Sequence, residues 1–240
     1  MHDIDTSISA GHAEQHMRSS EILTDIVIGM SDGLTVPFAL AAGLSGAVGQ
    51  AHLNLIWIAG IAEISAGSIA MGLGGYLAGK TEVDHYNSEL KREYEEVERL
   101  PEREKEEVRE FFSGLGLSRD VQDKAVDEMT RDKDKWVDFM MKYELGLDKP
   151  DPRRARKSAF NIGISYVVGG LIPLSPYFFV SSGITGLRIS ATITLCCLFI
   201  FGYFKSKLTG VNPLSGAIRV MIIGALAAGC AFAVARMIQS

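Results

Sequence analysis

The chain has 240 residues, with 24 Lys and Arg against 29 Asp and Glu and a formal net charge of −5. Residues 80–157 hold 22 of the 29 acidic residues, whereas the rest of the chain is rich in apolar side chains. No basic face emerges, which excludes nucleic acid as a partner. The three cysteines all lie in apolar segments, where we expect small buried side chains rather than a disulfide framework. The composition therefore predicts an all-α integral membrane protein with one soluble insert.

Five segments are apolar enough to cross a membrane, since a spanning helix needs about 20 apolar residues. They are residues 26–48, 55–79, 158–180, 187–204 and 216–237. The predicted organisation is a polar N-terminal segment (1–24), spanning helices one and two (25–79), an acidic helical insert (80–157) and spanning helices three to five (158–240). The polar start of the chain shows no signal-peptide pattern.

Lys and Arg near the ends of the spans predict the orientation, because cytosolic loops carry an excess of both. They gather at 153–157 and at Lys205 and Lys207, while the loops 49–54 and 181–186 contain neither. The N-terminus and the insert are therefore predicted to be cytosolic, and the C-terminus lies on the opposite side.

Two of the predicted spans contain acidic residues, which are costly in a membrane and mark functional sites. Asp25 and Asp32 are seven residues apart and share one stripe of the first span. Glu63 lies inside the second span, and Met71 follows two turns later. Carboxylates with a thioether suit a borderline cation, and their protonation would couple metal release to proton movement. The alternatives are a neutral, hydrogen-bonded Glu63 and an Asp25 that only favours a helix start.

The insert is predicted to form three amphipathic helices. The first covers 81–100 and ends at Pro101, which cannot continue the hydrogen-bond ladder. The second covers 102–113 and stops at a Gly-Leu-Gly turn, and the third covers 118–145. Such helices can pack together into a small domain.

Acidic residues within the insert are spaced to share helix faces. The pairs Glu93/Glu96 and Glu104/Glu107 are i,i+3, and two Met residues precede Glu144 by four and three positions. Carboxylate oxygen binds divalent cations, and thioether sulfur favours transition metals over Mg²⁺ and Ca²⁺. The candidate metal ligands are Glu93, Glu96, Glu104, Glu107, Met140, Met141 and Glu144. The alternative is a solvated charged face with i,i+4 ion pairs, and Met residues that serve only as core.

Small residues recur four positions apart, at Gly29/Gly33, Ala42/Gly46 and Gly75/Gly79. This spacing allows close helix approach, either within one chain or between two chains. Five spans make a thin bundle, which favours a homodimer with a pathway near its symmetry axis.

Residues 25–44, 62–77 and 160–173, together with the Glu-rich insert and its Pro101, resemble the vacuolar iron transporter family of plants, fungi and protists. The resemblance implies a dimeric Fe²⁺/H⁺ antiporter of the vacuolar membrane that loads cytosolic iron into the vacuole for storage and detoxification. It implies a cytosolic metal-binding domain that uses the seven insert ligands named above. It also implies a membrane pathway that uses Asp25, Asp32, Glu63 and Met71. Fe²⁺ is then a substrate, and no prosthetic group is implied.

Three alternatives stay open at this point. A broader exporter would carry Mn²⁺, Zn²⁺ or Co²⁺ on the same ligands, because the order of affinities does not by itself select Fe²⁺. A membrane-anchored di-iron carboxylate oxidase would use a Glu-x-x-His step from each of two helices, but Glu82/His85 is the insert's only such step. A metal-buffering domain on an inert anchor would leave Asp32 and Glu63 unexplained.

Overall fold

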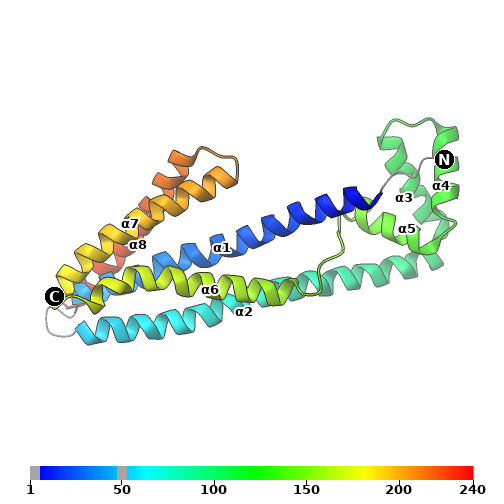
Figure 1. Cartoon of the computed structure of the whole chain (residues 1–240). Coiled ribbons are helices and arrows are strands. Elements are labelled where there is room, and N and C mark those ends of the chain that lie inside the picture. The colour runs from blue at the N-terminus through cyan, green and yellow to red at the C-terminus, as the bar shows by residue number, and fades with distance from the viewer. Residues whose placement is uncertain (1–5, 48–52, 240) are drawn as a thin grey trace. The chain divides into compact units, whose positions relative to one another are not determined.

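The computed structural model describes residues 6–47 and 53–239, and all regular structure in these ranges is helical (Figure 1). The elements are α1 (Thr6–Ala47), α2 (Leu53–Arg99), α3 (Pro101–Gly114), α4 (Arg119–Met129), α5 (Lys133–Phe139), the π turn η1 (Met140–Glu144), α6 (Arg154–Leu174), the 3₁₀ turn η2 (Ser175–Phe178), α7 (Gly183–Leu208) and α8 (Pro213–Gln239). The predicted all-α class is confirmed.

Five helices are long and apolar enough to cross a membrane, as predicted. They are α1, α2, α6 with η2, α7 and α8. Helix α1 begins at Thr6, so the described part of the polar segment 1–24 is helical and continuous with the first span. Most of the predicted loop 49–54 lies outside the described residues.

The chain forms two compact units. The first, called here the membrane unit, consists of Met1–Tyr76 and Arg156–Ser240, and the second, called the insert, is Leu77–Ala155. Helix α2 contributes to both, because its apolar first half continues without a break into a polar second half that ends at Arg99.

Glycines in the membrane unit allow helices to approach closely. A Cβ atom at Gly33 of α1 would overlap the carbonyl oxygen of Tyr166 in α6, and one at Gly67 of α2 would lie 2.5 Å from the Tyr166 hydroxyl. Likewise, Gly46 of α1 faces the ring of Phe232 in α8. Gly33 and Gly46, two of the small residues that recur four positions apart, therefore contact helices of the same chain.

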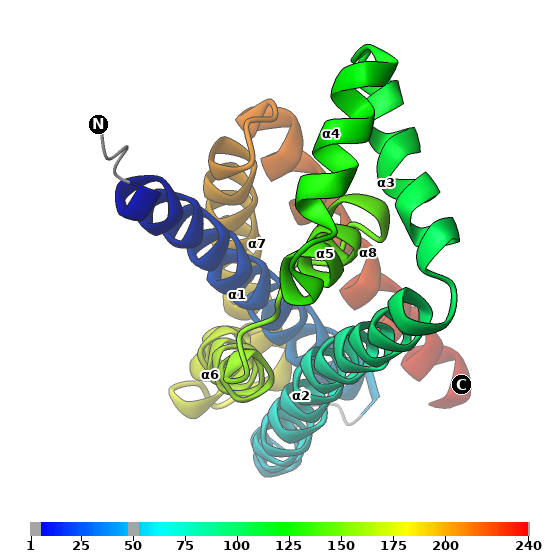
Figure 2. The same ribbon diagram turned by 90° about the vertical axis from the view of Figure 1, so that its right-hand side faces the viewer.

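The insert has an apolar core of its own, built from α2, α3, α4, α5 and η1. Helices α3 and α4 pack side by side (Figure 2). Each helix turns an apolar stripe inward, as expected of an amphipathic helix. The buried core residues are Tyr86, Val97, Val108, Val126, Trp136, Val137, Phe139, Met140 and Met141.

Two expectations were wrong. The predicted single helix 118–145 is interrupted after Thr130, because the Asp132 side chain accepts hydrogen bonds from the backbone N–H groups of Asp134 and Lys135 and so starts a new helix. Of the cysteines, Cys196 and Cys230 are exposed on α7 and α8 rather than buried. A helix that faces lipid needs no polar surface, so an exposed thiol costs little there.

Candidate metal centre

The turn after α2 determines where the acidic residues of the insert lie. Helix α2 ends at Arg99, Leu100 leaves the helical region with φ −130° and ψ 43°, and Pro101 opens α3. Proline suits this first helical position because its missing N–H has no helical partner there. The chain therefore folds back, and the first turns of α3 face the last turns of α2.

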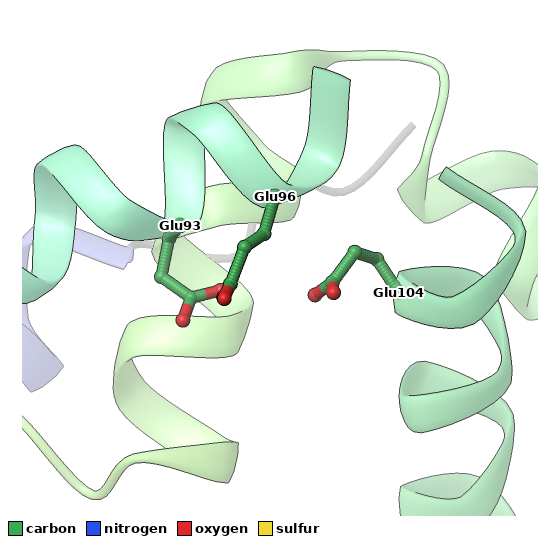
Figure 3. A group of neighbouring side chains, drawn as sticks. All are labelled: Glu93, Glu96 and Glu104. Carbon is green, nitrogen blue, oxygen red and sulfur yellow. The ribbon is translucent and has the colours of Figure 1, made fainter. Parts of the chain in front are cut away.

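Five carboxylates meet at this turn in two overlapping groups. Oxygens of Glu93, Glu96 and Glu104 lie within 4.8 Å of one another, and so do oxygens of Glu104, Glu107 and Glu144. Figure 3 shows Glu93 and Glu96 extending from α2 toward Glu104 on α3. Because Glu104 belongs to both groups, we treat them as one structure, the carboxylate cluster.

Two members of the carboxylate cluster are buried away from water. Glu93 is 1 % exposed and Glu104 is 2 % exposed. Burial, followed by the negative charges of Glu144 and Glu96, raises the pKa of the Glu93 carboxyl to about 7. Burial and the charges of Glu107 and Glu93 likewise raise the pKa of Glu104 to about 7. Carboxyls in such surroundings resist ionisation unless positive charge arrives.

Positive side chains neutralise part of the cluster, and one of them, Arg92, lies 3.8 Å from an oxygen of buried Glu93. Arg92 lies 3.6 Å from Glu96, and Arg103 lies 3.1 Å from Glu107, so the i,i+4 ion pairs expected of a solvated face do form there. Glu104, by contrast, forms no ion pair among the described residues, and the Glu93 Oε2 atom has no hydrogen-bond partner among them. Buried acidic oxygens without a partner are costly, and a divalent cation would supply the missing charge.

The two methionines lie in the core of the insert, one turn before Glu144. Met140 and Met141 are each 1 % exposed and begin the π turn that Glu144 ends. Single π turns are rare and recur at functional sites. Both methionines pack in the apolar core, so the structure places them there whether or not their sulfur atoms also meet a metal.

In the membrane unit, the candidate acids are held one by one rather than in a group. Asp25 is 1 % exposed and accepts hydrogen bonds from Ser158 Oγ at 2.9 Å and Asn161 Nδ2 at 3.3 Å, both on α6. Glu63 accepts a hydrogen bond from the Tyr166 hydroxyl. Its second carboxylate oxygen is buried without a partner among the described residues.

Asp32 and Met71 are the remaining candidates of the membrane unit. Asp32 is half-buried on α1 and directly precedes Gly33, which contacts the Tyr166 backbone. Met71 is half-buried on α2, two turns after Glu63. Tyr166 therefore lies between the helix that carries Asp32 and the helix that carries Glu63.

Comparison with known proteins identifies the family. The family model described as the VIT family matches residues 23–236. The chain belongs to the VIT family. All eleven candidate residues lie within the matched range.

Two plant relatives are similar to the chain over nearly their whole length, and a yeast relative is similar over two-thirds of its length. Vacuolar iron transporter 1 of Tulipa gesneriana is 51% identical over 229 residues, which cover 95% of this chain and 92% of the relative. Vacuolar iron transporter 1 of Arabidopsis thaliana is 50% identical over 228 residues, or 95% and 90% of the two chains. Protein CCC1 of Saccharomyces cerevisiae is 39% identical over 224 residues, covering 88% of this chain and 67% of the relative. The resemblance predicted from the sequence is confirmed.

The oxidase alternative finds no support in this VIT family chain. His85 is exposed, and its Nδ1 atom lies 3.9 Å from Glu89, outside the carboxylate cluster. The plant relatives are named as transporters, which also speaks against an enzyme.

Tyr166 is a candidate that the sequence interpretation missed. It is 2 % exposed and fits against Gly33 and Gly67 while it donates to Glu63. The only signal available in the sequence was a phenol within an apolar span. Its meaning depends on which helices pack together, which the spacing along the chain does not show.

Proposed function

We propose that this protein moves Fe²⁺ from the cytosol across the vacuolar membrane into the vacuole, in exchange for protons, for iron storage and detoxification. Membership of the VIT family and the names of its plant relatives support this proposal. The observation that carries it is the carboxylate cluster, in which buried Glu104 forms no ion pair among the described residues and one oxygen of buried Glu93 has no hydrogen-bond partner there. Part of this cluster stands on α2, the helix that also holds Glu63.

In this proposal the insert captures the metal. The ligands would be the five carboxylates of the cluster together with Met140 and Met141, and Fe²⁺ would be bound as a substrate rather than as a prosthetic group. Arrival of the cation would displace the protons that the raised pKa values of Glu93 and Glu104 retain near pH 7.

The proposed membrane pathway uses Asp25, Asp32, Glu63 and Met71. Tyr166 holds one oxygen of Glu63 and leaves the other free of any described partner. A carboxylate in that position can exchange a proton for a metal ion, since both compete for the same oxygen atoms. Such exchange couples Fe²⁺ entry to proton exit.

The proposal includes a homodimer with the pathway at its interface. Asp32 and Glu63 are both only half-buried in a single chain. An acid that faces hydrocarbon costs several kcal/mol, on the order of 3 by insertion scales, so a second copy that covers this surface is favoured. The small-residue spacings do not carry this argument, because Gly33 and Gly46 meet neighbours within the chain.

The proposed orientation follows the basic residues. Positive charges at 153–157 and at the end of α7 support a cytosolic N-terminus and insert and a lumenal C-terminus.

A second candidate is a broader exporter of divalent transition metals. All donors in the two carboxylate groups are oxygens, and such groups alone do not separate Fe²⁺ from Mn²⁺, Co²⁺ or Zn²⁺.

Transport into proteoliposomes tests both candidates. Vesicles that are acidic inside should accumulate Fe²⁺ and lose protons, and vesicles without a pH gradient should accumulate much less. Parallel assays with Mn²⁺, Co²⁺ and Zn²⁺ decide between a selective and a broad exporter. Equal Fe²⁺ accumulation with and without the gradient would contradict proton exchange.

A further inference from the structure

A polar cavity lies where α7 ends and α8 begins, in the membrane unit. The two helices pack side by side and are joined by a short loop (Figure 1). The cavity has a volume of about 220 Å³, and its lining includes Lys205, Thr209, Asn212, Ser215 and Arg219. Sites for drug-sized ligands run from about 300 to 1,000 Å³, so this space suits a smaller polar group.

The charge around this cavity is positive and uncompensated. Residues 158–240 contain no Asp or Glu, and among the described residues Lys205 and Arg219 form no ion pair. Lys205 is half-buried, so its charge is partly removed from water. Lys207 stands in the same last turn of α7 but does not line the cavity. Cations that converge without an acid favour an anionic ligand.

The donors that face this ligand would be side chains rather than the start of α8. Asn212 already caps that helix, because its side chain accepts from Leu214 N at 3.1 Å and Ser215 N at 3.3 Å. Its carbonyl also accepts from Gly216 N. The first N–H groups of α8 are therefore used, and the Thr209 hydroxyl donates to the carbonyls of Lys205 and Ser206. The cavity's capacity for an anion rests on Lys205, Arg219 and the Ser215 hydroxyl.

The orientation of the chain in the membrane does not by itself explain the positions of these three cations. Lys205 and Lys207 suit the negative end of α7 and the excess of positive charge on cytosolic loops. Arg219 gains nothing from a helix dipole, because it lies in the second turn of α8, toward that helix's positive end. Arg219 is exposed and lines the cavity, so its guanidinium is available to a ligand there.

We propose that the α7–α8 cavity binds a phosphate group, with Lys205 and Arg219 as its principal ligands. A phosphate group combines small size with enough negative charge for two cations, and guanidinium and ammonium groups bind it through charge-assisted hydrogen bonds. The group comes from one of two sources, the headgroup of a phosphorylated lipid in the adjoining leaflet or free inorganic phosphate.

Two binding measurements on the full-length protein test this proposal and separate the sources. The first measures retention of phosphatidylinositol 4-phosphate by native mass spectrometry, from nanodiscs that contain it in phosphatidylcholine. The second titrates inorganic phosphate by calorimetry into the protein in phosphatidylcholine nanodiscs. The variant Lys205→Gln with Arg219→Gln removes both ligands, and Arg188→Gln with Arg236→Gln is the matched control, because it removes one cation from each of the same helices outside the cavity.

The cavity variant should bind about a hundredfold more weakly, at about tenfold for each charged hydrogen bond, while the control binds like the unmodified protein. Loss in the lipid measurement identifies a headgroup, and loss in the titration identifies free phosphate. A third variant, Ser215→Asp, adds a carboxylate to the cavity while it favours the start of α8, so it should also abolish binding without unfolding the helix. Equal losses in the cavity and control variants, or no binding of either probe to the unmodified protein, would overturn the proposal.

Discussion

The insert and the membrane unit hold their acidic residues in opposite ways. In the insert, Glu93 and Glu104 are buried against other carboxylates and lack sufficient positive charge. In the membrane unit, Glu63 lies outside both carboxylate groups and accepts a hydrogen bond from the neutral hydroxyl of Tyr166 on α6.

This difference assigns different tasks to the two regions. Clustered carboxylates repel one another, so a cation stabilises the cluster more than a proton on any single member does. A single acid with neutral donors tolerates gain or loss of one proton without rearranging its neighbours. We infer that the insert binds metal and that Glu63 exchanges protons.

The largest expected effect is the loss of Fe²⁺ transport when Glu63 is neutralised. Glu63→Gln keeps an oxygen that can accept from Tyr166 but removes the ionisable group, so proton-driven Fe²⁺ uptake into proteoliposomes should fall to background. Glu82→Gln is the control, because it neutralises an exposed acid of the same helix outside the carboxylate cluster. Undiminished uptake by Glu63→Gln would remove Glu63 from the pathway.

The next effect concerns metal binding by the insert. Glu104 belongs to both carboxylate groups, so Glu104→Gln with Glu107→Gln should weaken Fe²⁺ binding to the full-length protein by at least about a hundredfold, measured by calorimetry without oxygen. Glu95→Gln, on the exposed side of α2, should leave the affinity unchanged. If the double variant binds as tightly as the unmodified protein, these two acids form only a solvated face.

A smaller effect should follow loss of the tyrosine hydroxyl. Tyr166→Phe preserves the ring that packs on Gly67 but removes the donor to Glu63. Loss of a hydrogen bond to a charged group predicts a fall in transport rate of about tenfold. The control is Tyr76→Phe, which alters an exposed tyrosine of α2. A rate equal to that of the control would reduce Tyr166 to a packing role.

The smallest effect is a dependence of stability on pH. Glu93 and Glu104 have pKa values near 7 in the folded insert, against an ordinary value of 4.5. The folded state therefore holds more protons between these pH values, and the metal-free insert should lose stability as pH rises from about 4.5 to 7. The free energy of unfolding should fall on the order of 3 kcal/mol for each of the two carboxyls.

Thermal unfolding with a chelator present measures this change. Trp136 fluorescence reports on the insert core in a Trp57→Phe background, which removes the chain's other tryptophan. Glu104→Gln should flatten the pH dependence. The metal-free protein with Glu104 intact could instead keep a constant unfolding temperature from pH 4.5 to 7. That result would mean that ionisation of the cluster does not destabilise the folded insert.

Much of this architecture is readable from local sequence. Apolar runs predict the five long helices because hydrophobic length is itself the constraint. Pro101 predicts the turn that brings the carboxylates of α2 and α3 together, because proline restricts both itself and Leu100.

What the sequence did not predict depends on contacts between distant residues. Asp132 reads like any other acid of a solvated face, yet it caps α5 and breaks the expected third helix. The spacings Glu93/Glu96 and Glu104/Glu107 predict that each pair shares a helix face, but they do not predict the burial of Glu93 and Glu104. The hydrogen bond from Tyr166 to Glu63 joins residues 103 positions apart. It could be predicted only by knowing that α6 packs on α2.

The most direct test is Fe²⁺ uptake as a function of Fe²⁺ concentration, in proteoliposomes that are acidic inside. If the insert captures metal and Glu63 exchanges protons, Glu104→Gln should raise the Fe²⁺ concentration for half-maximal uptake and leave the maximal rate unchanged. Glu63→Gln should show no uptake at any concentration. Vesicles with Glu63→Gln that still fill at high Fe²⁺, or Glu104→Gln vesicles with normal half-saturation, would contradict this division of tasks.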